Sequence, residues 1–274
     1  MRGKIYDSKL FYVFISLLAL ADVLFVLHIC CSYEALIRPI LPRLVEQNKI
    51  GNTVSGANWL AYFTILSNLF VSVWFLLWTA GKLFKSQPLI RFCQNQTVAT
   101  CVTLYIFVTG LLYTGSTVFG IRWFDTSDGG AVFNNVVNVY HHFIMPPLTM
   151  ALYFTMPLSK SESAREVAMT GMLFPMAYLA FSLIRGKAID WYAYPIFRPE
   201  MLWEAVFPTR TYDYATAVCL LLCEMLMLTA FFFLSGFAMT KIQNKRFEKF
   251  EVSKGEYVRE MPSGSEAQVT DSAK

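Results

Sequence analysis

Long apolar stretches alternate with short polar segments along almost the whole chain. Six of these stretches are long enough to cross the hydrocarbon core of a bilayer, which takes about 20 residues in a helix. They lie near residues 10–31, 58–81, 97–119, 136–157, 167–185 and 213–240. Backbone groups in hydrocarbon must be hydrogen-bonded within the protein, and these runs are too long for barrel strands. The pattern therefore predicts six transmembrane helices.

The polar remainder of the chain predicts no soluble domain. The first apolar stretch follows basic residues, as in a secretory signal, but it is too long and no small-residue cleavage site follows it. We interpret it as a retained first span. The expected organisation is an all-α, polytopic six-helix bundle over residues 1–240, followed by a polar, disordered tail over residues 241–274. A longer loop is expected over residues 186–212.

Charge indicates the orientation of this bundle. Only 15% of the 274 residues are charged, and 55% are apolar. Outside the predicted spans, 15 Lys and Arg residues lie on the side of the two termini and 8 on the other side. The positive-inside rule then predicts that both termini are cytoplasmic. The formal charge of +4 is expected to reflect topology and attraction to lipid headgroups, with no nucleic-acid partner.

The six cysteines suggest neither a disulfide framework nor a metal site. The sequence contains no CxxC and no HExxH pattern, and apolar packing is the expected role of most of these side chains. We therefore expect no metal and no organic cofactor. Prolines at 146, 147, 157 and 175 are expected to bend or break the fourth and fifth spans.

All three histidines, His28, His141 and His142, lie inside apolar stretches. Histidine is costly in hydrocarbon, so the adjacent pair marks a candidate functional site whose partners should lie on neighbouring helices. Asn134 and Asn138 belong to the same segment as this pair. The sequence therefore predicts a polar interior site on the fourth span.

The second span carries a matching polar face. Thr64, Ser67 and Asn68 follow one another at helical spacing, which places them on one side of the helix. Both spans enter from the outer side, and at about 1.5 Å per residue Thr64 and His141 each lie on the order of 8–10 Å below their helix starts. A hydroxyl and an imidazole at one depth suit a nucleophile and its general base. Ser, Thr and Asn also join membrane helices without any catalytic role.

Asp22 and Glu224 are the only acids well inside the predicted spans, and no Lys or Arg lies there to pair with them. Each is expected to be protonated, hydrogen-bonded to a polar neighbour, or exposed to a water-filled cavity. A structural acid and a proton-coupling acid are both compatible with this position.

Three short motifs occur in a characteristic order. Residues 62–66 read Tyr-Phe-Thr-Ile-Leu, residues 141–146 read His-His-Phe-Ile-Met-Pro, and residues 191–197 read Trp-Tyr-Ala-Tyr-Pro-Ile-Phe. Over most of spans two to five the chain resembles the androgen-induced and androgen-dependent membrane hydrolases, and it is most similar to the six-span microbial relatives of that family. The resemblance implies an intramembrane threonine hydrolase that acts on fatty acid esters of hydroxy fatty acids.

The resemblance assigns roles to individual residues of this chain. It implies that Thr64 is the nucleophile and His141 the base, while His142, at the same distance from a second proline, stays a candidate. Trp191 departs from the family pattern by one residue relative to the Tyr-Pro element. The substrate-binding candidates are two amides that could donate to an oxyanion, an arginine that could hold a carboxylate, and a tyrosine of the third motif: Asn68, Asn138, Arg185 and Tyr194.

Two other classes of function compete with the hydrolase. A proton-coupled transporter would use Asp22 and Glu224 as coupling acids, although the two halves of the chain show no internal repeat. A catalytically silent lipid-binding protein would keep the pocket and lose the chemistry. Lipid and membrane are the expected partners in all three cases, and the sequence specifies neither the lipid ester nor an oligomeric state.

Overall fold

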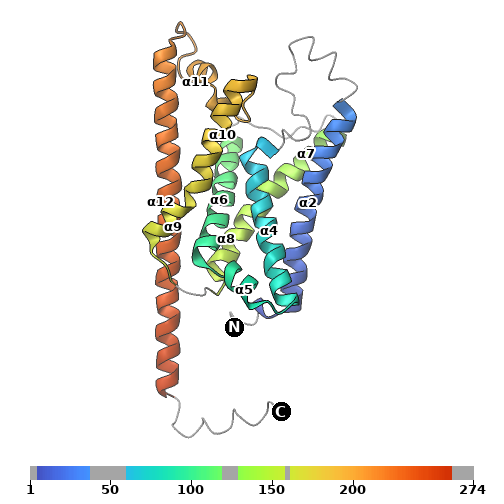
Figure 1. Cartoon of the computed structure of the whole chain (residues 1–274), viewed down its shortest axis with the longest axis vertical. Helices are drawn as coiled ribbons and strands as arrows, with labels where there is room; N and C mark the ends of the chain where they lie inside the picture. The colour runs from blue at the N-terminus through green and yellow to red at the C-terminus, as the bar shows by residue number, and fades with distance from the viewer. Residues whose placement is uncertain (1–4, 38–59, 119–128, 158–160, 261–274) are drawn as a thin grey trace.

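The computed structural model describes residues 5–37, 60–118, 129–157 and 161–260. Regular structure in these ranges is helical throughout, with no strand among them (Figure 1). Five helices in the described part are long and apolar enough to cross a membrane: Lys9–His28, Phe63–Leu83, Gln96–Gly115, Ala164–Ile189 and Tyr214–Lys249. These observations confirm the predicted all-α class and the predicted apolar helices of membrane length.

Five of the predicted apolar stretches correspond to long helical segments. Four of them are unbroken: α2 (Lys9–Ile37), α4 (Phe63–Leu83), α6 (Gln96–Val118) and α12 (Tyr214–Glu260). The predicted fifth span consists of two consecutive helices, α9 (Ala164–Gly171) and α10 (Leu173–Ile189), separated at Met172. The break lies just before Pro175, which has no N–H to donate to a carbonyl one turn earlier.

The predicted fourth span has an unusual backbone. The helical segment here begins seven residues earlier than the predicted start at 136 and consists of α7 (Gly129–Val139), a π-helical turn η2 (Tyr140–Ile144) and α8 (Met145–Thr155), one after the other without a gap. Because η2 interrupts the α-helical pattern, this segment is not among the five long helices. Pro146 and Pro147 follow the π turn directly and leave carbonyls of η2 without their usual amide donors. π turns inside helices are frequent at functional sites.

Helices α4 and α6 lie in the middle of the bundle, with α2 on one side and α12 on the other (Figure 1). The core between α2 and α4 is aromatic, and Trp74, Phe75 and Trp78 of α4 are almost completely buried. The outward faces of α2 and α12 expose large apolar side chains, including Leu17 and Leu226. An extensive apolar exterior is what a helix bundle in contact with lipid presents.

The predicted disorder of the tail is wrong for residues 241–260, because α12 continues as a helix to Glu260. Side chains at the start of this segment fix the helix to the bundle. Gln243 Nε2 donates to the carbonyl of Tyr153 at 2.5 Å, and Asn244 Nδ2 donates to the carbonyl of Glu162 at 2.8 Å. Residues 261–274 lie outside the described residues.

Two predicted loops also contain helical structure. The 186–212 segment includes a 3-10 turn, η3 (Pro195–Phe197), and helix α11 (Pro199–Val206), whose Trp203 is buried. The short connection between the second and third spans contains α5 (Gln87–Cys93). Cys93 of α5 is completely buried and its carbonyl accepts a hydrogen bond from Trp74 Nε1 at 3.0 Å. These helices close the two ends of the bundle.

Candidate functional site

Three buried polar side chains from three helices meet inside the bundle. His141 Nε2 of η2 lies 2.8 Å from Asp22 Oδ1 of α2, and Ser72 Oγ of α4 donates to Asp22 Oδ2 at 2.7 Å. Asp22 and Ser72 are fully buried and His141 is 2% exposed. Of the alternatives predicted for Asp22, the structure shows hydrogen bonding to polar neighbours.

The Asp22 carboxylate determines how the His141 imidazole is oriented. An ionised carboxylate can only accept hydrogen bonds, so opposite Asp22 in its ionised form the Nε2 atom would be the donor. Nδ1 then keeps its lone pair and is the nitrogen that can accept a proton. The rings of Phe25 and Tyr140 lie against the imidazole with centroid distances of 6.5 and 5.8 Å. The cluster therefore holds one basic nitrogen in a largely apolar surrounding.

Thr64 lies in the first turn of α4 and contacts the third sequence motif. Its hydroxyl lies 3.2 Å from the hydroxyl of Tyr194, and its backbone N–H donates to the same Tyr194 oxygen at 3.3 Å. The start of α4 is further fixed by Tyr178, whose hydroxyl donates to the carbonyl of Ala61 at 2.7 Å. The structure thus brings together the predicted nucleophile and the predicted substrate-binding tyrosine.

Asn68 connects this turn of α4 to the histidine segment. Its Nδ2 donates to the carbonyl of Thr64 at 2.9 Å and to the carbonyl of His141 at 3.4 Å. The side chain is fully buried, and its Oδ1 has no hydrogen-bond partner among the described residues. Asn68 therefore acts here as an interhelical link. The Thr64 hydroxyl and the His141 ring are not bonded to each other: the first contacts Tyr194 and the second Asp22.

His142 faces a different neighbour from His141. Its ring stacks on Tyr113 of α6 with a centroid distance of 3.7 Å and an interplanar angle of 11°. Consecutive residues of a helical turn point in different directions, and the two imidazoles have different partners here. Sequence spacing alone left these two residues equivalent, and the structure distinguishes them by their contacts.

None of the remaining candidates, Arg185, His28 and Asn138, has a contact with Asp22, His141 or Thr64 among the hydrogen bonds, ion pairs and ring contacts described. The Arg185 guanidinium lies 4.5 Å from the centre of the Trp191 ring, and the His28 ring lies 4.6 Å from that of Phe133. Asn138 is half-buried on α7. Sequence reasoning missed Ser72, which follows Thr64 by two helical turns on the same face of α4. Its helical spacing from Thr64 is the sequence feature that could have identified Ser72.

Glu224, the second acid within a predicted span, is separate from this cluster. Glu224 is half-buried on α12, and its Oε2 atom has no hydrogen-bond partner within the described residues. Across the described ranges, no group of three or more His, Cys, Asp and Glu side chains converges as metal ligands. Asp22 is therefore the acid that contacts the candidate site.

The arrangement contains the parts of a proton-transfer site: an oriented imidazole, a carboxylate that orients it, and a nearby hydroxyl linked through the backbone. No protein-family model, curated protein or solved structure matched the chain. The candidate site therefore consists of Asp22, His141, Thr64 and Asn68, joined by the hydrogen bonds described above.

Proposed function

We propose that the chain is an intramembrane ester hydrolase in which Thr64 is the nucleophile and His141 the general base. The observation that carries this proposal is the buried Asp22–His141 pair, with a 2.8 Å hydrogen bond that leaves Nδ1 as the proton acceptor. The motif resemblance supports the choice of substrate, fatty acid esters of hydroxy fatty acids or similar lipids. No cofactor takes part in the proposed reaction.

In the proposed reaction His141 Nδ1 takes the proton of Thr64 while Oγ1 attacks the ester carbonyl carbon. The tetrahedral intermediate collapses, the hydroxy acid leaves, and His141 returns the proton to the departing oxygen. Water then attacks the carbonyl carbon of the Thr64 acyl ester while His141 accepts a proton from it, the bond between the acyl carbon and Thr64 Oγ1 breaks, His141 returns the proton to Oγ1, and the free fatty acid leaves. Asp22 keeps the imidazole in the required tautomer and stabilises the imidazolium that forms.

Substrate binding must bring the Thr64 hydroxyl from Tyr194 to the imidazole. Catalytic hydrogen bonds are often long or poorly aligned without substrate and shorten only in the reactive complex. Asn68 supports this step because it already joins the Thr64 turn to the His141 turn through their carbonyls. The Tyr194 hydroxyl, released from Thr64, is placed to donate to the oxyanion, a contribution of about 3 kcal/mol for one donor.

The proposal includes a sixth span formed by residues 129–155. This segment of 27 residues is about 40 Å long at 1.5 Å per residue, which exceeds the hydrocarbon thickness of roughly 30 Å. It packs beside α6, one of the five long apolar helices. An even number of spans agrees with the start of α2 and the end of α12 lying at one end of the bundle (Figure 1). We assign that end to the cytoplasm from the Lys and Arg asymmetry.

Hydrolysis of a lipid ester by the purified protein in detergent tests the function. Thr64→Ala is expected to abolish turnover and Thr64→Ser to retain part of it, because serine keeps a hydroxyl at the same position. Thr79→Ala is the matched control, since Thr79 lies on the same helix and bonds Ser16 at 2.9 Å, away from the site. Undiminished turnover in Thr64→Ala would exclude Thr64 as the nucleophile.

A proton-coupled transporter is the second candidate, and the same buried pair favours it. Asp, Glu and His chains inside membrane helices serve as proton relays in pumps and transporters. In reconstituted vesicles such a protein would take up its solute in response to a pH gradient, and Asp22→Asn would abolish this uptake. We expect no such uptake. Its observation, with Thr64→Ala equal to wild type, would favour the transporter.

A further inference from the structure

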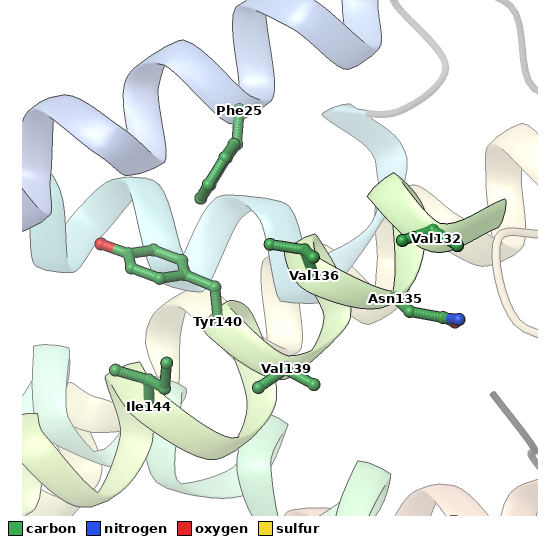
Figure 2. A pocket seen from close by; sticks show the side chains of 7 residues that line it. All are labelled: Phe25, Val132, Asn135, Val136, Val139, Tyr140 and Ile144. Atoms are coloured by element: carbon green, nitrogen blue, oxygen red, sulfur yellow. The ribbon is translucent and has the colours of Figure 1, made fainter. Parts of the chain in front are cut away.

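An apolar groove lies on the outside of the bundle between α2 and the α7–η2 segment. Figure 2 shows Phe25 extending from α2 toward the other wall, which residues of α7 and η2 form. The groove has a volume of about 400 Å³ and is lined by Phe25, Val132, Asn135, Val136, Val139, Tyr140 and Ile144. Its size falls in the range of small-molecule sites, roughly 300–1,000 Å³.

One wall of this groove is also a wall of the candidate site. Tyr140 precedes His141 directly, and the Phe25 ring meets the rings of both residues, at 5.2 Å for Tyr140 and 6.5 Å for His141. Tyr140 is held in place because its hydroxyl donates to the carbonyl of Leu18 at 2.6 Å. A molecule in the groove therefore lies one side chain away from the Asp22–His141 pair.

The residues that line the groove favour a hydrocarbon chain as its occupant. Six of its seven lining residues are apolar or aromatic, and the remaining residue, Asn135, carries a neutral amide. In Figure 2 the Asn135 amide lies at the end of the groove away from Tyr140 and Ile144. Val132, Val136 and Ile144 are each about half exposed, at 46%, 51% and 44%. The groove is thus open along its side, toward the surface that faces lipid in a membrane.

The length of the groove matches one leaflet of a bilayer. Val132 and Ile144 are separated by about 18 Å along the helix axis at roughly 1.5 Å per residue. Half of a hydrocarbon core of about 30 Å is 15 Å. An acyl chain beside α7 can therefore enter the groove laterally from the bilayer, without moving to a different depth in the membrane.

We infer that this groove holds the acyl chain of the ester substrate, with lateral entry between α2 and α7. The inference rests on the proposed function and adds the binding site of the substrate's long acyl chain, which lies along Val132, Val136 and Ile144 next to Tyr140. The ester group then reaches the His141 side of the Phe25–Tyr140 wall. Esters with short chains lack this contact.

Photo-crosslinking tests chain binding without requiring turnover. The protein is reconstituted in phosphatidylcholine vesicles with a long-chain fatty ester that carries a diazirine in its chain, and adducts are mapped by mass spectrometry. We expect adducts on residues 132–144 and at Phe25, which an unlabelled fatty acid ester of a hydroxy fatty acid displaces and added phosphatidylcholine does not. Equal displacement by phosphatidylcholine would assign the groove to bulk lipid and overturn the inference.

Variants that fill the groove with a larger side chain test the same binding site. Val136→Trp and, independently, Val132→Trp are expected to reduce adducts in the groove to below about a tenth and to lower kcat/KM for long-chain esters at least about tenfold, with short-chain esters little changed. Leu222→Trp, at an exposed apolar position on α12, is the control and should change neither. Unchanged groove labelling in both valine variants would contradict the inference.

The two readouts separate this inference from the proposed function. Suppose that the groove is labelled in the wild-type protein and not in the valine variants, but the protein has no esterase activity. This result would support the chain-binding site and contradict the proposed hydrolase. Hydrolysis that depends on Thr64, without adducts in the groove, would keep the hydrolase and reject the chain site. Thr64→Ala should retain the adducts, because the Thr64 side chain is not part of the groove.

Discussion

The Asp22 carboxylate accepts one hydrogen bond through each oxygen, from His141 Nε2 and from Ser72 Oγ, and all three residues are buried. Buried charged groups need such partners, and removing one partner of a buried pair typically costs about 3–5 kcal/mol. The cluster is therefore expected to matter for folding as well as for chemistry. A variant that tests its chemical role must keep these hydrogen bonds while it removes the ionisable carboxyl group.

Asp22→Asn makes that change. The amide keeps the size of the side chain and its capacity for hydrogen bonding, but it no longer fixes the tautomer of His141 or stabilises an imidazolium. We expect kcat for ester hydrolysis to fall on the order of 10³-fold or more, as when the orienting acid of a catalytic triad is replaced by its amide. Steady-state kinetics measure this loss, and Ser72→Ala should cause a smaller one.

The control for Asp22→Asn is the pH profile. If Asp22 acts through His141, the pH dependence of kcat/KM should change together with its magnitude. A protein that keeps both wild-type kcat and the wild-type profile would show that Asp22 only joins α2 to η2.

The two adjacent histidines give a second prediction at this scale. His141→Gln keeps a donor for Asp22 and removes the base, so we expect hydrolysis to fall by about 10²–10⁴-fold, the usual contribution of a general base. His142→Phe keeps the aromatic stack on Tyr113 and should retain most activity. Rates measured side by side in detergent decide this, and the reverse ranking would transfer the role of base to His142.

Sequence reasoning identified several of these residues because helical spacing is visible in a sequence. Thr64 and Asn68 stand one turn apart, and the structure links them through Asn68 Nδ2. The Asp22–His141 contact was not predictable in the same way. It depends on how α2 and η2 are rotated about their own axes, and apolar stretches with few polar positions leave that rotation unspecified.

At the scale of the elements, the π turn η2 is held against α6 by a close backbone approach. A Cβ added at Gly110 would lie 2.7 Å from Cβ and Cγ of Pro146 and 3.2 Å from the carbonyl oxygen of His142. Neither a proline ring nor a backbone carbonyl can move aside easily. Glycine at 110 therefore allows η2 and the start of α8 to reach their positions beside α6.

Gly110→Ala is expected to destabilise the protein by about 1–3 kcal/mol, the usual cost of an extra carbon in a packed interior. Because the clash displaces η2, ester hydrolysis should fall as well. Gly115→Ala on the same helix is the control, since a Cβ there meets no atom within 4 Å. Thermal unfolding in detergent measures both, and equal midpoints for the two variants would contradict this packing.

The elements themselves were predictable to different extents. The apolar stretches near 58–81 and 97–119 became the single helices α4 and α6, because nothing in their interiors interrupts the backbone pattern. The prolines at 146 and 175 indicated breaks in two other spans, and the structure has a π turn before the first and the α9–α10 break before the second. The helical continuation to Glu260 was missed because it depends on tertiary contacts: Gln243 bonds Tyr153 of α8, and Asn244 bonds Glu162, just before α9.

In the proposed arrangement the whole molecule crosses the membrane an even number of times, with both termini in the cytoplasm. Single cysteines at Glu204 of α11 and Glu248 of α12, in a background without reactive native cysteines, should be labelled from opposite sides of a sealed membrane. Both positions are exposed. We expect labelling of the first from outside and of the second from the cytoplasm. Labelling of both from one side would exclude the six-span arrangement.

Labelling by a fluorophosphonate shows directly whether Thr64 is an activated nucleophile, because such probes phosphonylate an activated hydroxyl with loss of fluoride. We predict one adduct, mapped to Thr64 by mass spectrometry, which is absent in Thr64→Ala and strongly reduced in His141→Gln and Asp22→Asn. Thr79→Ala should label like wild type. An adduct that persists in Thr64→Ala, or maps to another residue, would contradict a threonine hydrolase built on Thr64, His141 and Asp22.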